Sequence, residues 1–193
     1  AGGGGVSGRG GERGLGWAGG AGARGGGTAK AGGEGVAAMS VEAESAAAKA
    51  GDGRAEDALG LMYADGDGVA RDDALAAKWF AAAATQGHAQ AAYNLGVLTV
   101  NGRGVARDYG LARGQFEQAA ASVPSAAYNL GVLYDQGLGA SPDAAQALVW
   151  YRKAADAGHA GAQYTLGQMY YEGIGVEADE PTALRWFSAA AAQ

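Results

Sequence analysis

The chain has 193 residues, 37 glycines, no cysteine and a formal net charge of −6. The lack of cysteine excludes disulfides and thiolate metal sites. No run of residues approaches the eighteen apolar positions of a membrane-spanning helix, and the first residues do not form a secretory signal sequence. The default expectation is a soluble cytoplasmic protein, with export left open because the sequence starts without methionine.

Glycine dominates the first part of the sequence. Residues 1–38 hold 18 of the 37 glycines and almost nothing apolar beyond Leu15 and Trp17. Such a stretch buries too little surface to offset the loss of backbone entropy, so it is predicted to be a disordered tail. Two Arg-Gly-Gly segments, at Arg9 and Arg24, leave an RNA-binding tail as an alternative. A third interpretation is that Met39 is the true start and the preceding residues are translated leader.

Alanine and acidic residues dominate the remainder. From Met39 onward there are ten basic and eighteen acidic residues, a net charge of −8. This balance does not favour binding of nucleic acid or of an anionic membrane by bulk charge. Residues 40–51 are predicted to form one helix, opened by Ser40 and closed by Gly51. This helix matches the second half of a repeat unit and is expected to cap the array that follows.

One module recurs along the rest of the chain. Tyr93-Asn94-Leu95-Gly96-Val97-Leu98 is repeated without change at residues 128–133, and looser copies lie on either side. The leucines that mark the copies are spaced 36, 35 and 36 residues apart: Leu59, Leu95, Leu130 and Leu166. This spacing predicts an all-α solenoid of two-helix units, an array over residues 40–193 with units at about 53–88, 89–124, 125–159 and 160–193.

Each unit follows one plan. Its first helix is expected to end at a pair of glycines, because they permit the positive φ of a tight reversal. The pairs are Gly66 and Gly68, Gly102 and Gly104, Gly137 and Gly139, and Gly173 and Gly175. Four residues later an aspartate is expected to cap the second helix, at Asp72, Asp108, Asp143 and Asp179.

A glycine also lies inside every first helix, at Gly60, Gly96, Gly131 and Gly167. Because a glycine there costs about 1 kcal/mol relative to alanine, a common compensation is needed. We expect a large ring from the second helix to pack against the bare backbone. The aromatic pairs are Trp79-Phe80, Trp150-Tyr151 and Trp186-Phe187, with Gln115-Phe116 the exception. Trp150 is predicted to be buried between the two helices of the third unit.

With these residues in place, the chain resembles the Sel-one-like repeat family, relatives of the tetratricopeptide repeats. Its pattern is matched by Ala55, Leu59-Gly60, Tyr63, Gly66-Asp67-Gly68-Val69, Asp72, Trp79 and Ala82-Ala83. The resemblance covers residues 40–193 and implies a right-handed superhelix of antiparallel helix pairs. It also implies an adaptor that assembles protein complexes, often in bacteria. Some cysteine-rich members of the family have been linked to β-lactam binding, and the lack of cysteine argues against that subgroup here.

No catalytic, metal or cofactor motif emerges from the sequence. His88 and His159 occupy the same repeat position two units apart, which favours a structural role over a ligand pair. Asp65-Gly66-Asp67-Gly68 has part of a calcium-loop pattern, but Val69 and Ala76 stand where further ligands are needed. Two classes of function therefore remain, an interaction scaffold and a small-molecule binder or enzyme with its site in the groove. The shortage of titratable groups outside repeat positions favours the scaffold.

Helical geometry predicts where a protein or peptide partner would bind. If the Leu-Gly face of each first helix packs on the second helix, residues two before and two after the leucine point roughly away from it. These residues are expected to line a concave groove: Asp57, Tyr93, Tyr128 and Tyr164 in one column, and Leu61, Val97, Val132 and Gln168 in the next. The alternative is that the tyrosines only pack between neighbouring units.

Overall fold

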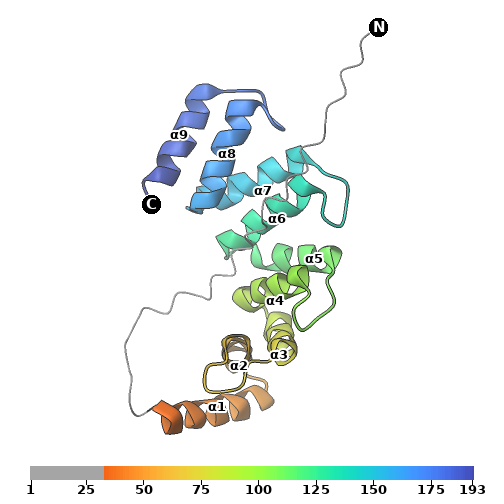
Figure 1. Ribbon diagram of the computed structural model, residues 1–193, viewed down its shortest axis with the longest axis vertical. Coiled ribbons are helices and arrows are strands. Elements are labelled where there is room, and N and C mark those ends of the chain that lie inside the picture. The colour runs from red at the N-terminus through yellow and green to blue at the C-terminus, as the bar shows by residue number, and fades with distance from the viewer. Residues whose placement is uncertain (1–32) are drawn as a thin grey trace.

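The computed structural model describes the backbone of residues 33–193 and the side chains from residue 41 onward. This part of the chain forms nine α-helices and no strand, which confirms the expected all-α repeat architecture. The helices are α1 (Gly33–Lys49), α2 (Gly53–Asp65), α3 (Asp73–Thr85), α4 (Ala89–Asn101), α5 (Tyr109–Ala119), α6 (Pro124–Gln136), α7 (Ala144–Asp156), α8 (Ala160–Glu172) and α9 (Glu180–Ala191). They follow one another in chain order along the long axis of the molecule (Figure 1).

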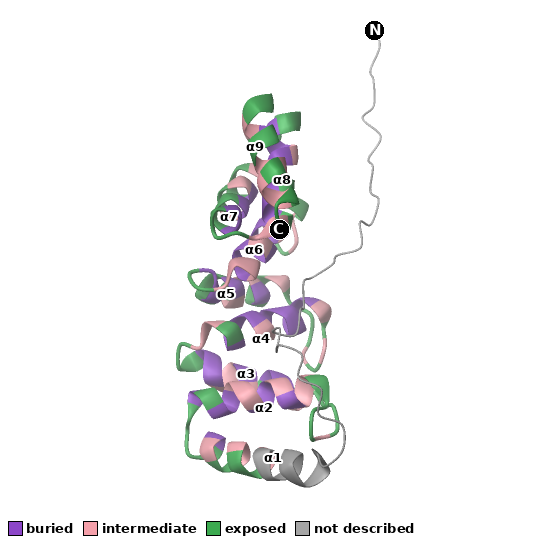
Figure 2. Cartoon of the chain, turned by 90° about the vertical axis from the view of Figure 1, so that its left-hand side faces the viewer, coloured by how far each residue is buried: buried purple, intermediate pink, exposed green. Residues whose placement is uncertain are grey.

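The helices pack in pairs. Within the units α2 packs on α3, α4 on α5, α6 on α7 and α8 on α9. Each unit joins the next through its second helix, because α3 contacts α4, α5 contacts α6 and α7 contacts α8. One hydrophobic cluster consequently runs from Ala76 in α3 to Ala183 in α9. Burial follows the same order, with buried residues on the inner faces along the whole stack (Figure 2).

The first helix is longer than expected. α1 begins at Gly33, seven residues before Ser40, and therefore includes residues 33–38 that the sequence analysis assigned to the tail. Val36, Ala37 and Ala38 are compatible with a helix, so the backbone continues upstream of the serine. Residues 1–32, including both Arg-Gly-Gly segments, lie outside the described part. The position expected for α1 is confirmed, because Ala48 packs with Ala55, Leu59 and Met62 of α2.

The predicted helix ends are confirmed. The carboxylates of Asp72, Asp108, Asp143 and Asp179 each accept a hydrogen bond from a backbone N–H in the first turn of the following helix. The first helices end at Gly66, Gly102, Gly137 and Gly173, all with φ between 65° and 76°. Since only glycine adopts this left-handed conformation at little cost, the chain reverses at the same place in every unit.

A ring does pack against each mid-helix glycine, but it is the second residue of the aromatic pair. A Cβ atom added to Gly131 would lie 2.5 Å from the Tyr151 ring, and Gly60, Gly96 and Gly167 face Phe80, Phe116 and Phe187 in the same way. Trp150, predicted to be buried, is only half-buried. The reason is helical spacing, because Tyr151 lies four residues from both Ala147 and Ala155 on the buried stripe, whereas Trp150 lies one step to its side.

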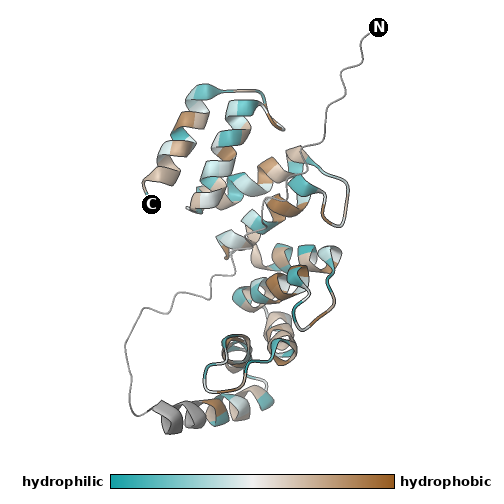
Figure 3. Ribbon diagram, viewed as in Figure 1, coloured by the Kyte–Doolittle hydropathy of each residue, from teal (hydrophilic) through white to brown (hydrophobic). Residues whose placement is uncertain are grey.

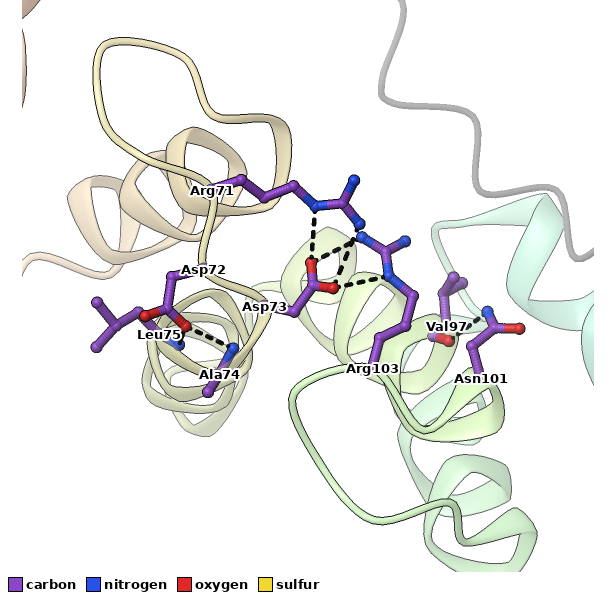
Figure 4. Close-up of polar contacts among 8 residues, drawn as sticks. All are labelled: Arg71, Asp72, Asp73, Ala74, Leu75, Val97, Asn101 and Arg103. Carbon is purple, nitrogen blue, oxygen red and sulfur yellow. Dashed lines mark hydrogen bonds and ion pairs between the residues drawn. The ribbon is translucent and has the colours of Figure 1, made fainter.

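The second glycine of three of the pairs lies against the preceding unit. A Cβ atom at Gly104 would collide with the backbone of Asp73, at the start of the preceding unit's second helix. Gly139 approaches Tyr109 and Gly175 approaches Ala144 at the equivalent place. At the first of these junctions the Asp73 carboxylate lies between two arginines (Figure 4). Arg103 donates to it at 2.7 and 3.0 Å and Arg71 at 3.3 Å.

Candidate functional site

The candidate site consists of the first-helix positions two before and two after each repeat leucine. The tyrosines among them do not point away from the second helices as expected, because the rings of Tyr93, Tyr128 and Tyr164 lie against rings of the second helix of their own unit. The leucine that marks each unit is fully buried in three of the four, at Leu59, Leu130 and Leu166, while Leu95 is half-buried. The eight residues expected to line a groove lie two positions to either side of these leucines. They differ widely in exposure, and so only some of them are available to a partner.

Tyr93 and Val97 are buried, with 3 % and 8 % of their surface exposed. The Tyr93 ring lies 6.0 Å from the Phe116 ring of its own unit. Burial raises the pKa of the Tyr93 hydroxyl, partly offset by hydrogen bonding with the side chain of Ser125 in the next unit. This tyrosine therefore connects two units and does not face solvent. The groove expected at the second unit is filled by the protein itself.

Tyr128 has an intermediate position. Its ring centroid lies 5.6 Å from that of Tyr151 and 4.6 Å from that of His159, on which it stacks. His159 is the N-cap of α8, and its Nδ1 accepts a hydrogen bond from the Ala162 N–H at 3.1 Å. Burial lowers the pKa of His159, which keeps this nitrogen unprotonated and able to accept. Tyr128 thus packs on a ring of its own unit and on the cap of α8, and only part of its surface is exposed.

Asp57 stands where the other units have a tyrosine. It is half-buried, its Oδ1 is enclosed without a hydrogen-bond partner, and burial raises its pKa, with His88 acting in the opposite direction. The neighbouring Glu56 is instead paired, since its Oε2 accepts a hydrogen bond from Gln86 at 2.8 Å. The first unit therefore presents a polar position in the column that is aromatic elsewhere.

Of the other expected residues only Tyr164 is exposed, and the rest keep part of their surface accessible. Leu61, Val132 and Gln168 are half-buried, and Tyr164 has 54 % of its surface exposed although its ring lies 5.5 Å from that of Phe187. Sequence reasoning missed Asn94, which is half-buried next to Tyr93 and accepts a hydrogen bond from Gln90 at 3.2 Å. The sequence indicates this contact, because Asn94 follows Gln90 by four residues and residues at this spacing lie on the same helix face.

The possible metal ligands in the described part of the chain are histidine, aspartate and glutamate side chains. No three side chains of histidine, aspartate or glutamate among the described residues lie close enough to hold a metal ion. His88 and His159 stand at separate junctions, as the N-caps of α4 and α8. No helix in the described range is long and apolar enough to span a membrane, and polar and apolar positions alternate along the helices in Figure 3.

Stacked helix pairs with an accessible first-helix face define a helical-repeat protein of the solenoid class. The chain belongs to the Sel1 repeat family, whose model matches residues 53–88, 89–122, 124–159 and 160–193. Proteins with Sel1 repeats generally mediate protein–protein interactions, and the family is generally a non-catalytic scaffold. A search of the curated proteins gave no match.

Two crystal structures are similar to this chain over most of its length. The first, from uropathogenic Escherichia coli strains, is a protective antigen that displays an SLR fold. It has 38% sequence identity and a TM-score of 0.79 over 81% of this chain and 34% of its own. The second is a Sel1 repeat protein from Oxalobacter formigenes, with 33% identity and a TM-score of 0.78 over 80% of this chain and 64% of its own. The chain thus spans about a third and just under two thirds of the lengths of these proteins.

Proposed function

We propose that the chain is a protein-interaction scaffold that binds an extended or helical peptide segment along the accessible face of its first helices. The supporting observation is that Tyr164 is more than half exposed and that Leu61, Val132 and Gln168 keep part of their surface accessible, while Leu59, Leu130 and Leu166 beside them are fully buried. Membership of a family that generally mediates protein–protein interaction agrees with this function.

The chemistry of the open residues indicates what kind of segment fits. Tyr164, with part of Tyr128, offers aromatic surface and a polar tip, which is favourable for peptide contacts at low entropic cost. Val132 and Leu61 offer aliphatic surface, and Asp57 places a carboxylate at the first unit. The suited segment therefore carries apolar side chains toward the third and fourth units and a polar or basic side chain toward the first.

Selection from a random peptide library, followed by affinity measurements on variants, tests this proposal. We expect Val132→Glu and Gln168→Glu to lower the affinity for a selected peptide by about tenfold or more, since each puts a charge into the contact surface. Leu111→Glu and Val149→Glu are the matched controls, because both side chains are more than half exposed on second helices. If the control variants lower the affinity for the peptide as much as the first-helix variants do, the peptide does not bind on the first-helix face.

A further inference from the structure

The helix α5, in the middle of the stack (Figure 1), differs from the second helices on either side of it. It has eleven residues, whereas α3 and α7 have thirteen each. It also contains two glycines, Gly110 and Gly114, that no close packing requires. A Cβ atom would meet only the Asp108 side chain at the first and nothing within 4 Å at the second. Because glycine lowers the stability of a helix relative to alanine, α5 has the lowest intrinsic stability of these three helices.

One side chain of α5 lowers the stability of the second unit further. Gln115 occupies the repeat position of Trp79, Trp150 and Trp186, and its Oε1 atom is enclosed without a hydrogen-bond partner. Such an atom has lost its hydrogen bonds to water and gained none in the protein, so it destabilises the packing around it. The second unit thus lacks the tryptophan of the other units and buries an unpaired oxygen in its place.

The connection from α5 to α6 lacks two features of the connection from α7 to α8. The latter turns at Gly158, with φ of 86°, and its N-cap His159 accepts a hydrogen bond from the first turn of α8. Residues 120–123 contain no glycine, and the N-cap Val123 has no side-chain atom that could accept such a bond. The first turn of α6 is therefore held less firmly than that of α8.

The contact surface of α6 carries a buried amide. Asn129 is fully buried beside Tyr93 of the second unit, and neither polar atom of its side chain has a hydrogen-bond partner. At the same position of α8, the Thr165 hydroxyl donates a hydrogen bond to the carbonyl oxygen of Gly161 at 2.9 Å. α5 also packs less extensively on α6 than α3 does on α4 or α7 on α8. Separation of α5 and α6 would let water reach the amide, which lowers the cost of opening this contact.

The contacts between units on either side have additional links. Between the first and second units, Gln118 donates a hydrogen bond to the carbonyl oxygen of Ala84, and the ion pair in Figure 4 adds a second link. Between the third and fourth units, Gln163 donates to the carbonyl oxygen of Ala155 at 3.2 Å, and a tyrosine ring stacks on His159. The contact in the middle thus separates two more firmly joined halves, units one and two and units three and four.

We propose that the array bends at the contact between α5 and α6, which we call the hinge, with units one and two as one rigid half and units three and four as the other. The stability of a repeat array is a sum over its units and the interfaces between them, so the array yields first at its weakest interface. The turn at Gly139, which lies against Tyr109 at the start of α5, stays in contact and acts as the pivot.

Bending at the hinge changes the distance between the accessible residues of the two halves. Leu61 lies in the first half, whereas Val132, Tyr164 and Gln168 lie in the second. The angle at the hinge therefore sets which lengths of a bound segment can contact both halves. This consequence rests on the proposed function, whereas the hinge itself can be tested on the protein alone.

Distances between pairs of spin labels test the hinge, because the chain has no cysteine and labels can be attached to introduced ones. Ala81, Glu117 and Arg152 occupy the same repeat position, one residue after the ring that packs on the mid-helix glycine. Glu117→Cys with Arg152→Cys spans the hinge, and Ala81→Cys with Glu117→Cys is the matched control across the first junction. We expect the distance distribution of the hinge pair to be at least about twofold broader than that of the control pair. Equal widths, or a broader control, would overturn the proposal.

Substitutions test the origin of the bend. Gly114→Ala together with Asn129→Leu removes the unpacked glycine and the unpaired amide, and is expected to narrow the distribution of the hinge pair to the width of the control pair. The thermal midpoint of this double variant is expected to be no lower than that of the original chain, which shows that it folds. Thr165→Val, at the position of Asn129 in α8, is expected to leave the distribution unchanged. An equally broad distribution in the double variant would exclude these residues as its cause.

Hydrogen exchange provides a second measurement that needs no substitution. Amide hydrogens of α5 are expected to exchange at least about tenfold faster than those of α3, since a helix of low stability opens locally more often. Equal protection of α5 and α3 would contradict the low stability on which the hinge depends.

Discussion

The packing of Gly131 on Tyr151 depends on the absence of a side chain at the glycine. The ring occupies the space that a Cβ atom would need, with ring atoms 2.5 Å from that point. Because the glycine lies in a helix, its intrinsic cost of about 1 kcal/mol relative to alanine is offset by the burial of an aromatic ring. Each of the four units has this arrangement.

Gly131→Ala is therefore expected to destabilise the protein by roughly 1–3 kcal/mol, since the overlap with Tyr151 outweighs the gain in helix propensity. Gly114→Ala in α5 is the matched control, because a Cβ atom there meets nothing within 4 Å. That variant is expected to gain about 0.5–1 kcal/mol. Urea unfolding of both variants measures the difference, and a loss at both positions would contradict the packing argument.

The two aromatic residues of the third unit, Trp150 and Tyr151, differ in burial and are therefore expected to differ in their contribution to stability. Tyr151 is buried on Gly131, so Tyr151→Ala is expected to cost about 3–5 kcal/mol of unfolding free energy. Trp150 is half-buried and its ring also faces Lys153, whose Nζ lies 5.1 Å from the ring centroid. Trp150→Ala is expected to cost clearly less. Comparison of the two unfolding midpoints checks the order, and a larger loss at Trp150 would contradict it.

At the scale of the element, single side chains cap the starts of several helices. Asp52 is the N-cap of α2 and His159 is the N-cap of α8; they occupy the same repeat position, and both accept hydrogen bonds from the first turn. Unlike the aspartate, the histidine accepts through a nitrogen that loses this ability on protonation. The stability of the fourth unit is therefore expected to depend on pH near neutrality.

The direction of this dependence follows from the lowered pKa of His159. In the folded protein the imidazole stays neutral at pH values where the unfolded chain, with its ordinary value near 6.5, binds a proton. Stability contributed by the neutral form is complete above about pH 6.5 and is lost as pH falls from there toward the folded pKa. His159→Asp is expected to remove this step while keeping the cap. Thermal midpoints measured from pH 8 to pH 5 test it, and an unchanged step in the variant would contradict this origin.

Asp73 connects α3 to the turn that follows α4. Hydrogen bonding with Arg103, and secondarily with Arg71, lowers the pKa of its carboxyl group. Because a lowered pKa favours the folded state only while the carboxylate is charged, the contribution is present above the ordinary value near 3.8 and fades as pH falls through the folded pKa. The ion pair is partly exposed, so Asp73→Asn is expected to cost less than about 1 kcal/mol at pH 7. This cost is expected to shrink at pH 3 and in high salt, and a cost unaffected by either condition would exclude the ion pair as its cause.

The elements themselves could be predicted well from the sequence because their signals are local. Aspartate caps, glycine reversals and the 36-residue spacing each act within one turn or one unit, and every predicted helix end from Gly66 to Asp179 was found. Contacts across units could not be read in the same way. Tyr93 has the same sequence context as Tyr128, yet only Tyr93 is buried beside Ser125 and Asn129. The prediction that Trp150 is buried was also wrong, because helical spacing places the neighbouring Tyr151 on the buried stripe with Ala147 and Ala155.

At the scale of the whole molecule, the two ends of the array are unlike. α1 packs on Leu59 and Met62 at the first unit, whereas in α9 Leu184 is exposed and Phe187 is half-buried. Amide hydrogens of α9 are therefore expected to exchange at least about tenfold faster than those of α7, since local opening is easiest where few apolar contacts are lost. Hydrogen exchange measured for each helix tests this, and equal protection of α7 and α9 would indicate a single cooperative unit.

The backbone contacts of Gly104, Gly139 and Gly175 have a further consequence for the geometry of the array. Each brings the turn of one unit close to the start of the preceding unit's second helix, where an added Cβ atom would meet Asp73, Tyr109 or Ala144. A change of angle at one of these contacts moves every unit beyond it. The displacement of a unit therefore grows with its distance from the contact. A substitution at Gly104 would thus rotate the second, third and fourth units relative to the first while leaving each of them internally intact. For a ligand long enough to contact units on both sides of Gly104, the distance between its contact residues would then change.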